Sequence, residues 1–552
     1  MIALLQQYLI EQAERSPQSL ALVASEERVT YAELEQESNR IARLLKDVGC
    51  RSGDCVCLLV PKAPYSILGM LGVLKAGGIY VPVDIATPAP RVQRIVTASA
   101  ARLLLAAEPA RPLLEELCAQ PAPAVGFLDS ASPEGENFQP LFSAEDWTGY
   151  SAEPLPSFRT TDDVAHILFT SGSTGIPKGV PILHRNVIRF VEWAVRYFGI
   201  GPSDRNSGHS PLHFDLSTFD IYGTLAAGAE LHLVPPALSL LPHKLAAFIR
   251  DAELTQWFSV PSVLTYMAKF DALSDQDFPS LRKLLWCGEV LPTPTLIYWM
   301  ERLPHVQFTN LYGPTETTIA SSYYRVPHRP VSDTEPIPIG AACEGEELYV
   351  LDEALRPVPP REIGEIYIGG AGLSPGYWRD EEKTGAAFVP NPLVNDPSAH
   401  IYRTGDRGSI GEGGLLYFHG RADSQIKSRG YRIDLGEIEA ALNAIVGIRE
   451  SAAVGVESDG FEGTAICCAY APAEGSVINP RKLRGELARV LPSYMLPQRW
   501  LSVAGLPKNV NGKIDRRELK ERFVAQAVAA SAHAAGGAQP GALPRRLSGG
   551  VG

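Results

Sequence analysis

Residues 167–180, with the sequence ILFTSGSTGIPKGV, hold the densest group of side chains able to do chemistry. Glycines let the backbone turn tightly and direct N–H groups at an anion, hydroxyls add donors, and lysine adds a point charge. The spacing matches neither the P-loop, nor the dinucleotide fingerprint, nor the serine nucleophile elbow. The segment predicts a polyphosphate-binding loop, the alternative being a Ser/Gly turn without a ligand. Its candidate residues are Thr170, Ser171, Gly172, Ser173, Thr174, Gly175 and Lys178.

A second candidate is the segment NLYGPTETT at residues 310–318. A glycine followed by a proline is typical of a turn, and this turn would present Thr315 and Glu316. Mg²⁺ prefers one or two carboxylates plus phosphate oxygens, so Glu316 is a candidate metal ligand beside a triphosphate. Tyr312 offers a flat face for stacking an adenine. The alternative is that Thr315 only caps the start of a helix.

Two isolated residues are further candidates. Asp406 follows a strand-like stretch, and its carboxylate can accept hydrogen bonds from both hydroxyls of a ribose. Lys513, in the segment NGKIDR, is a cation near the predicted end of the folded chain. Taken alone, an aspartate in such a place is typical of a turn, and a lone lysine is typical of solvated surface.

Helices and strands elsewhere in the chain must position these candidate residues. The chain has 552 residues, and at about 150 residues per domain this length predicts three to four folding units. The chain carries 50 basic and 62 acidic residues, and this acidic surplus disfavours nucleic acid and anionic lipid as partners. The most apolar region, residues 58–83, is interrupted by prolines and lysines, which argues against a membrane span. The 8 cysteines form no CxxC pair, so we expect reduced thiols and a cytoplasmic protein.

Helix-like and strand-like stretches alternate along the chain, which predicts α/β layers with largely parallel sheets. Residues 39–48 and 65–75 have helical spacing, and residues 55–60 and 79–83 are apolar runs typical of buried strands. Residues 119–157, rich in Pro, Ala, Glu and Ser, predict a surface linker.

Changes in composition predict three regions. We expect a large N-terminal body of layered α/β subdomains over residues 1–420 and a small α+β domain over residues 421–524. Residues 525–552 consist mainly of Ala, Gly, Pro and Ser, with too little bulky apolar content to order a chain, and predict a disordered tail.

The candidate segments described above resemble the motifs of adenylate-forming enzymes and occur in the same order along the chain. This superfamily contains acyl-CoA synthetases, luciferases and nonribosomal peptide synthetase adenylation domains. The resemblance covers roughly residues 1–524 and favours the adenylation-domain branch. Further matching segments are VTYAEL (29–34), LKAGGIYVPVD (74–84), FDLS (214–217), GEIYIGGAGLSPGYW (364–378), YRTGD (402–406), GRADSQIKSRGYRIDLGEIE (420–439), LPSYMLP (491–497) and NGKIDR (511–516). The resemblance implies the adenylate-forming enzyme fold, with a mobile C-terminal domain that turns about a hinge at Asp423.

The resemblance also assigns roles in binding ATP and Mg²⁺. It implies that Asp406 and Arg421 hold the ribose and that Glu316 holds the metal. Lys513 would bridge the substrate carboxylate, a ribose oxygen and the α-phosphate, so that two anions can meet; no nucleophile of the enzyme is needed. Phe418 stands where the family often has tyrosine, which leaves only ring packing. The remaining nucleotide residues that it implies are Gly288, Glu289, Asn310, Leu311, Tyr312, Gly313 and Thr315.

The amino-acid pocket is likewise implied by the resemblance. Asp215 would pair with the α-ammonium group of the substrate and thereby disfavour acids without an amine; the alternative is that Asp215 caps the following helix. The other predicted lining residues are Phe214, Leu216, Phe219, Ser262, Leu285, Cys287, Leu311, Ile319 and Ala320. This lining is nearly all apolar and uncharged, so we expect a small neutral side chain, most like proline, with alanine-like, cysteine-like and β-amino acids also open. His213 has no predicted role beyond packing.

The chain contains neither a carrier-protein serine motif nor a condensation motif. We therefore expect a free-standing ligase that forms aminoacyl-AMP and pyrophosphate, and then loads the phosphopantetheine thiol of a separate carrier protein in natural-product biosynthesis. The runner-up hypothesis is an acyl- or aryl-CoA synthetase, against which Asp215 argues. A non-catalytic relative is the third hypothesis, and the presence of Lys178, Glu316, Asp406 and Lys513 argues against it.

Overall fold

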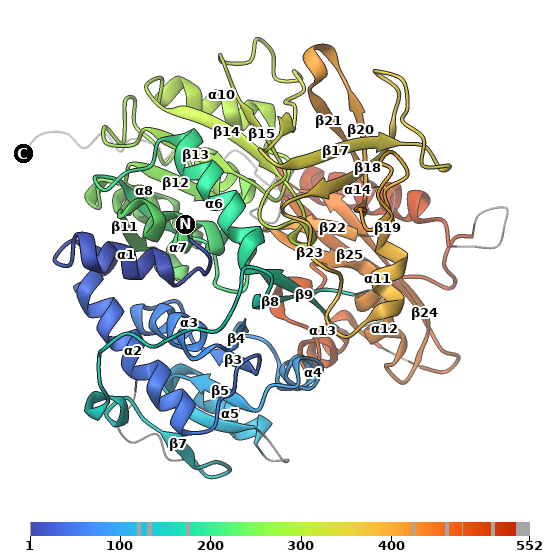
Figure 1. Ribbon diagram of the computed structural model, residues 1–552. Helices are drawn as coiled ribbons and strands as arrows, with labels where there is room; N and C mark the ends of the chain where they lie inside the picture. The colour runs from blue at the N-terminus through green and yellow to red at the C-terminus, as the bar shows by residue number, and fades with distance from the viewer. Residues whose placement is uncertain are drawn as a thin grey trace, which may run out of the picture.

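The computed structural model describes residues 2–118, 123–129, 135–172, 177–421, 425–458, 463–476, 478–508 and 514–536, with side chains as far as residue 526. Two large sheets with their helices form the N-terminal part, a smaller antiparallel sheet adjoins them, and the C-terminal residues form an α+β unit to one side (Figure 1). The predicted α/β body followed by a smaller α+β unit is confirmed. Among the described residues, no helix has the length and apolar character that crossing a membrane requires.

The first sheet has seven strands in the order β7-β6-β5-β3-β4-β8-β9, and its one antiparallel pair is β8–β9. Its strands are β3 (Cys55–Leu59), β4 (Ile79–Pro82), β5 (Leu103–Ala106), β6 (Ala124–Phe127), β7 (Pro140–Phe142), β8 (Val164–Thr170) and β9 (Lys178–Leu183). The helices of this part are α2 (Tyr31–Asp47), α3 (Pro64–Ala76), α4 (Ala89–Ser99) and α5 (Arg111–Leu117). Every residue of β3 is buried, as expected for a parallel strand covered on both faces.

Two segments of this first sheet differ from the sequence prediction. Helix α2 starts well before residue 39, because Thr30 and Glu33 form a capping box at its beginning. The predicted linker contributes the strands β6 and β7, and it buries Phe127 and Phe142. A few apolar residues in a proline-rich stretch are therefore enough to extend the edge of the sheet.

The second sheet has nine strands in the order β16-β15-β14-β13-β12-β10-β11-β1-β2. These strands are β1 (Leu20–Ala24), β2 (Glu27–Thr30), β10 (Arg205–Gly208), β11 (Glu230–Leu233), β12 (Gln256–Ser259), β13 (Lys283–Trp286), β14 (Gln307–Tyr312), β15 (Ser322–Arg325) and β16 (Ala341–Ala342). The accompanying helices are α1 (Gln7–Arg15), α6 (His184–Phe198), α7 (Asp215–Ala227), α8 (Pro242–Asp251), α9 (Pro261–Lys269) and α10 (Thr293–Arg302). The strands β10 to β14 run parallel, so the loops that follow them emerge at one edge.

The third sheet is antiparallel, with the order β17-β18-β20-β19 and β21 paired to β20. It consists of β17 (Glu346–Leu351), β18 (Gly364–Gly370), β19 (Phe388–Pro390), β20 (His400–Ile410) and β21 (Leu416–Arg421), with the helix α11 (Glu381–Ala387). Strand β20 carries Asp406, and β21 ends at Arg421. This sheet therefore brings both predicted ribose-binding residues to neighbouring strands.

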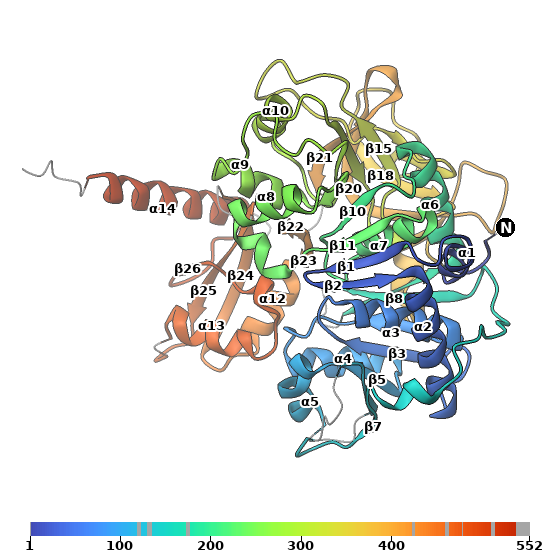
Figure 2. The same cartoon turned by 90° about the vertical axis from the view of Figure 1, so that its left-hand side faces the viewer.

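The C-terminal unit contains a two-stranded hairpin and a three-stranded sheet in the order β24-β25-β26. Its elements are β22 (Gln425–Ser428), β23 (Tyr431–Asp434), α12 (Leu435–Asn443), β24 (Ile448–Glu457), β25 (Thr464–Pro472), α13 (Pro480–Ala488), β26 (Arg499–Ser502) and α14 (Arg516–Gly536). The last helix continues 11 residues beyond residue 525, the predicted start of the disordered tail, as far as Gly536, and Figure 2 shows it extending away from the body. Alanine, the best helix former, is frequent there; residues 537–552 lie outside the described part.

Candidate active site

The predicted phosphate loop joins two antiparallel strands, β8 and β9. Thr170 ends β8 directly opposite Lys178, the first residue of β9. The hydroxyl of Thr170 is buried and has no hydrogen-bond partner among the described residues, so a donor is available for a phosphate oxygen. The Ser171 hydroxyl instead donates to the carbonyl of Arg432 at 2.6 Å and accepts from the N–H of Asp434 at 3.1 Å. Of the other loop residues, Gly172 is described, whereas Ser173, Thr174 and Gly175 are not.

Glu316 is the centre of a buried group of polar side chains. The hydroxyl of Tyr377 donates to its Oε1 at 2.8 Å, and Lys178 Nζ lies 3.3 Å from the same hydroxyl. Arg432 Nη1 donates to both oxygens of Glu316, at 3.1 Å and 2.9 Å. Burial alone would raise the pKa of Glu316, but Arg432 and Lys178 outweigh it and lower the pKa to about 2. Glu316 is therefore a carboxylate that always carries its charge at neutral pH.

Magnesium does not fit beside Glu316 in this arrangement. The side chain of Glu316 is 0% exposed, and the guanidinium group of Arg432 lies against both of its oxygens. A divalent cation would meet the positive charge of Arg432 at contact distance. The metal role predicted for Glu316 therefore requires Arg432 to be elsewhere.

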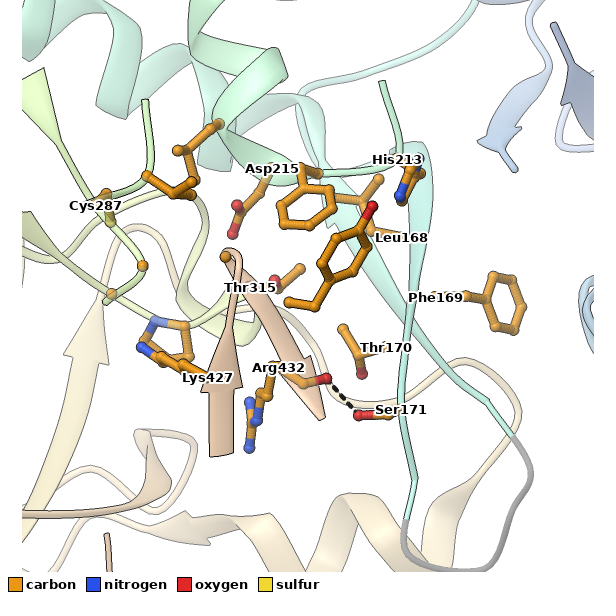
Figure 3. A pocket seen from close by; sticks show the side chains of 18 of the residues that line it. Leu168, Phe169, Thr170, Ser171, His213, Asp215, Cys287, Thr315, Lys427 and Arg432 are labelled. Atoms are coloured by element: carbon orange, nitrogen blue, oxygen red, sulfur yellow. Dashed lines mark hydrogen bonds between the residues drawn. The ribbon is translucent and has the colours of Figure 1, made fainter. Parts of the chain in front are cut away.

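The predicted nucleotide residues surround one cavity (Figure 3). Asp406 accepts a hydrogen bond from the Tyr312 hydroxyl at 2.7 Å and pairs with Arg421. At Gly313 a Cβ atom would lie 2.6 Å from Ala320 Cα, so no side chain fits there. The predicted residues that line the cavity are Thr170, Ser171, Gly288, Gly313, Thr315, Asp406 and Arg421.

Other predicted nucleotide residues lie behind this lining. Glu289 is held by backbone N–H groups, from Ser262 at 3.1 Å and from Gly430 at 2.9 Å. Asn310 donates to the carbonyl of Pro338, and Phe418 packs on Tyr312 with ring centroids 6.5 Å apart. The cavity lining does not include Glu289, Asn310, Leu311, Tyr312 or Phe418 in the part of the chain that the structure describes.

Asp215 is the first residue of α7, and the residue before it, Phe214, makes no side-chain capping bond to this helix. Its carboxylate is buried at the cavity and points toward Thr315 in Figure 3. Burial raises the pKa of Asp215 from 3.8 to about 6, although hydrogen bonding to Thr315 and the charge of Lys427 act in the opposite direction. A buried carboxylate of this kind favours a cationic partner.

The predicted amino-acid pocket residues form one region. Phe214, Leu216 and Cys287 line the cavity with Asp215. A single buried apolar cluster contains Leu216, Phe219, Leu285, Cys287, Leu311, Ile319 and Ala320. The Ser262 hydroxyl is buried and has no partner among the described residues. The structure thus brings together the apolar residues that the sequence analysis predicts for the pocket, whereas Ser262 belongs neither to the cavity lining nor to this cluster.

The β22–β23 hairpin supplies site residues that the sequence analysis did not single out. Lys427, Gly430, Tyr431 and Arg432 line the cavity. Gly430 has φ +80°, and a Cβ there would lie 2.5 Å from a Val260 side-chain atom, so only glycine fits. These four residues lie in the segment GRADSQIKSRGYRIDLGEIE, which resembles a motif of the family. The resemblance alone does not tell which of its side chains contact the cavity.

Several aromatic side chains pack together at the tip of this hairpin. Tyr431 stacks on Tyr494 at 3.6 Å and meets Phe214 edge-on at 4.7 Å. His213 packs against Phe214 with ring centroids 5.1 Å apart, in agreement with a packing role.

The predicted cation Lys513 and the predicted hinge Asp423 lie outside the described residues.

Comparison with known proteins agrees with this geometry. The sequence model described as "AMP-binding enzyme" matches residues 9–378, and that described as "AMP-binding enzyme C-terminal domain" matches residues 437–513. An L-proline--[L-prolyl-carrier protein] ligase of Streptomyces coelicolor is 37% identical over 498 residues, which are 89% of this chain and 91% of the relative. Tyrocidine synthase 3 of Brevibacillus parabrevis is 34% identical over 93% of this chain and 8% of its own length.

Solved structures show the same likeness. The crystal structure of IdnL1 is 30% identical and has a TM-score of 0.74, covering 91% of this chain and 99% of that one. This chain spans only about a tenth of the length of the tyrocidine and gramicidin synthases that it matches. The family models and the relatives show that the chain belongs to the AMP-binding enzyme family and is an adenylation domain of the nonribosomal peptide synthetase type.

Proposed function

We propose that this protein activates a small neutral amino acid, proline-like or another small aliphatic one, to aminoacyl-AMP and then transfers it to the phosphopantetheine thiol of a carrier protein in trans, in natural-product biosynthesis. The observation that carries this proposal is the position of Asp215. Its buried carboxylate opens onto the cavity that also contains Thr170, Gly288 and Asp406. An ammonium group and a nucleotide can therefore be held side by side.

The proposed first half-reaction uses ATP as a substrate. A carboxylate oxygen of the amino acid attacks the α-phosphorus in line; the new O–P bond forms as the bond to the bridging oxygen breaks, and pyrophosphate leaves. Asp215 holds the α-ammonium, Asp406 and Arg421 hold the ribose, and the Thr170 hydroxyl donates to a phosphate oxygen. Lys178 and Lys513 supply positive charge to the meeting anions. Such reactions depend mainly on positioning and charge neutralisation.

The proposed second half-reaction forms a thioester. The thiol sulfur attacks the carbonyl carbon of aminoacyl-AMP, its proton passes to solvent, and AMP leaves with the electron pair of the broken C–O bond. The hairpin residues Gly430 and Tyr431 line the cavity next to Phe214. Because Gly430 has no side chain, the hairpin backbone can pack directly against Val260 at the edge of this cavity.

The substrate class follows from the lining of the pocket. Apart from Asp215 and Ser262, the predicted lining is apolar and uncharged, so a charged substrate side chain would be buried without a partner. The name of the Streptomyces relative, a proline ligase of similar length, supports a proline-like substrate. Apolar pockets discriminate by only about 1–3 kcal/mol per methylene, so neighbouring small amino acids remain in the proposed class.

The experiment that tests this proposal is ATP–pyrophosphate exchange with the twenty amino acids, β-amino acids and imino acids. We expect the highest exchange with proline or a small aliphatic amino acid and background exchange with charged ones. A panel of fatty and aryl acids is the matched comparison. Exchange with those acids but with no amino acid would replace the proposal by an acyl- or aryl-CoA synthetase. A carrier protein carrying phosphopantetheine should gain the aminoacyl mass in the same mixture.

A further inference from the structure

The turn between β14 and β15 contains two neighbouring residues with backbone angles that β-branched side chains rarely adopt. The φ angles of Thr318 and Ile319 are +59° and +69°. The N–H of Ala320 donates to the carbonyl of Thr318 at 2.8 Å, which closes a γ-turn of the rare, strained kind around Ile319. Strained backbone of this kind persists only where the surrounding structure holds it in place.

The strained turn forms a wall of the proposed amino-acid pocket. Ile319 and Ala320 are each 1% exposed and belong to the buried apolar cluster that also contains Leu216 and Cys287. The Cys287 thiol, which lines the cavity, lies 3.8 Å from the carbonyl oxygen of Ile319. The backbone angles of the turn therefore decide where this wall of the pocket stands.

The loop that follows β18, residues 371–374, binds the turn. The hydroxyl of Thr318 donates to the carbonyl of Gly372 at 2.7 Å. The N–H of Ser374 donates to the carbonyl of Glu316 at 2.9 Å. The loop thus contacts the turn at two positions, and its own placement fixes the strained residues.

Glu346, the first residue of β17, fixes this loop. Its Oε1 accepts a hydrogen bond from the N–H of Gly372 at 2.7 Å. A Cβ at Gly372 would lie 2.5 Å from the carbonyl oxygen of Thr317 and 2.8 Å from Oε1 of Glu346, so Gly372 is enclosed between the turn and the carboxyl group.

The carboxyl group of Glu346 acts at this place as a neutral group. Its Oε2 is buried and has no hydrogen-bond partner among the described residues. Burial raises the pKa of Glu346 from 4.5 to about 8, although the N–H of Gly372 acts to lower it. The group is therefore mostly protonated at pH 7, and a hydrogen bond with a neutral acceptor holds Gly372.

We propose that Glu346 is a positioning residue that sets the size of the amino-acid side chain admitted to the pocket. Glu346 holds the loop at Gly372, and the loop in turn holds Thr318. Without the carboxyl group the strained turn can relax toward ordinary backbone angles, and the wall formed by Ile319 and Ala320 moves with it. This inference rests on the proposed function, because it needs the amino-acid pocket, and it adds a determinant of specificity that lies outside the predicted lining.

ATP–pyrophosphate exchange kinetics with Glu346→Ala test the proposal. We expect KM for the preferred amino acid to rise about tenfold, while KM for ATP changes by less than about twofold, since Thr170 and Asp406 belong to other elements. The preference over an aliphatic amino acid with a larger side chain should narrow by at least about fivefold. Glu346→Gln keeps a neutral oxygen acceptor for the N–H of Gly372 and should recover most of both values.

A second pair of variants removes the same connection at its other end. Thr318→Val has the shape of threonine without the hydroxyl and should reproduce the effects of Glu346→Ala, whereas Thr318→Ser keeps the hydroxyl and should stay close to the wild type. Glu347→Ala removes the exposed carboxylate next to Glu346, which accepts a hydrogen bond from Tyr349, and serves as the matched control. Melting temperatures show which variants are folded, and the Thr318 pair decides the matter if Glu346→Ala is not.

Amide hydrogen exchange gives a measurement that does not depend on activity. The amides of Ala320 and Ser321 report the turn, because they donate to the carbonyls of Thr318 and Tyr312. In Glu346→Ala, peptides covering residues 313–322 should exchange about tenfold faster than in the wild type. Peptides covering β24 are the internal reference and should not change.

The outcomes separate failure of this inference from failure of the proposed function. If the wild type exchanges pyrophosphate with amino acids, and Glu346→Ala keeps both KM and side-chain preference, the inference is wrong and the proposed function stands. Equal changes in Glu347→Ala, or an equal rise of KM for ATP, would also overturn the inference, because they show a general loss of structure. A wild type that exchanges only with acids lacking an amine overturns the proposed function, and this inference with it.

Discussion

The hydroxyl of Tyr312 donates a hydrogen bond to Oδ2 of Asp406 across 2.7 Å, which ties β14 of the nine-stranded sheet to β20 of the five-stranded sheet. Tyr312 is the residue before the Gly313 turn, and Asp406 is the predicted ribose acceptor. The bond therefore fixes the distance between the Gly313 turn and Asp406, both of which line the cavity. Burial raises the pKa of Tyr312 well above its ordinary value, and the charge of Asp406 adds to the effect.

We expect Tyr312→Phe to weaken both folding and nucleotide binding. A hydrogen bond to a charged group contributes about 1.5–3 kcal/mol, so the unfolding free energy should fall by about 2 kcal/mol and KM for ATP should rise. Chemical denaturation and ATP titration measure the two effects. Tyr349→Phe, which removes a hydroxyl bonded to Glu347 and to Asn391 away from the cavity, is the control and should leave KM for ATP unchanged. An equal rise of KM in both variants would show that Asp406 does not depend on Tyr312.

Asp215 should make amino-acid binding depend on pH. Because its pKa in the folded protein is raised to about 6, the ionised fraction increases from about one tenth at pH 5 to about nine tenths at pH 7. The dissociation constant of the amino acid should therefore fall about tenfold over this interval. Isothermal titration calorimetry at several pH values measures it. In Asp215→Asn the pH dependence should vanish and binding at pH 7 should be weaker.

The same raised pKa carries a stability prediction with a definite sign. The folded protein holds the Asp215 proton more tightly than the unfolded chain does, so the ionised carboxylate destabilises the fold as pH rises from 3.8 to about 6. Above pH 6 the full penalty applies, and Asp215→Asn should then unfold at a higher temperature than the wild type. A lower melting temperature for this variant at pH 7 would contradict the interpretation that the buried Asp215 carboxylate destabilises the protein when no cationic substrate is bound.

Ser262 should control pocket size without stabilising the fold. Its buried hydroxyl has no partner among the described residues, and leaving a polar group in that state is costly. Ser262→Ala should therefore be as stable as the wild type or more so, with the same substrate preference. Ser262→Phe should fill the pocket and lower kcat/KM for proline-sized amino acids at least about tenfold, while ATP binding stays unchanged. Exchange kinetics and calorimetry check these outcomes, and an unaffected proline value would place the pocket elsewhere.

The sequence could predict the parts of the site that are local in the chain. The hydroxyl and glycine run after β8, the turn at Gly313 and the aspartate at the start of α7 are strings of neighbouring residues, and their chemistry can be inferred from composition. The partners of Glu316 could not be found in this way. Arg432 and Tyr377 lie 116 and 61 residues from it along the chain, so only the packing of three sheets and the hairpin decides their contact.

Composition alone missed two strands of the first sheet. Residues 119–157 were predicted from their composition as a surface linker, and they contribute β6 and β7. Composition averages over a window, whereas β6 needs only the buried Val125 and Phe127 to join a sheet edge that is already formed. The first turns of helix α14 are anchored by Leu519 and Phe523, which pack against β24 and β25. The helix then continues through residues of high helix propensity.

Lys513→Ala should suppress the first half-reaction without affecting the fold. Removing one well-placed stabilising group typically slows such a step about 10²–10³-fold, so amino-acid-dependent exchange should fall by that factor. Transfer of the aminoacyl group from supplied aminoacyl-AMP to the carrier protein should persist, because the second step has no need of this cation. Lys520→Ala, an exposed lysine of α14, is the control. Full exchange in Lys513→Ala would remove Lys513 from the proposed mechanism.

The buried pair of Arg91 and Glu437 should hold the C-terminal unit against α4. Removing one member of a buried ion pair costs about 3–5 kcal/mol, because the other charge is left without a partner. In Arg91→Ala this cost can be avoided if the unit moves away and Glu437 becomes hydrated. We therefore expect a larger radius of gyration in small-angle X-ray scattering, with little change in the melting temperature of the N-terminal body.

A double variant distinguishes the pairing of these charges from general packing. Replacing a buried pair by apolar residues of similar size is often neutral or stabilising, so Arg91→Met combined with Glu437→Leu should restore the wild-type radius of gyration. Each single substitution should expand the protein, since it leaves either a charge or an apolar group facing the wrong partner. If the double variant is as expanded as Arg91→Ala, the two residues are not coupled and α4 does not hold the unit through this pair. If Arg91→Ala and both single substitutions of the double variant stay compact, the pair does not hold the C-terminal unit against α4.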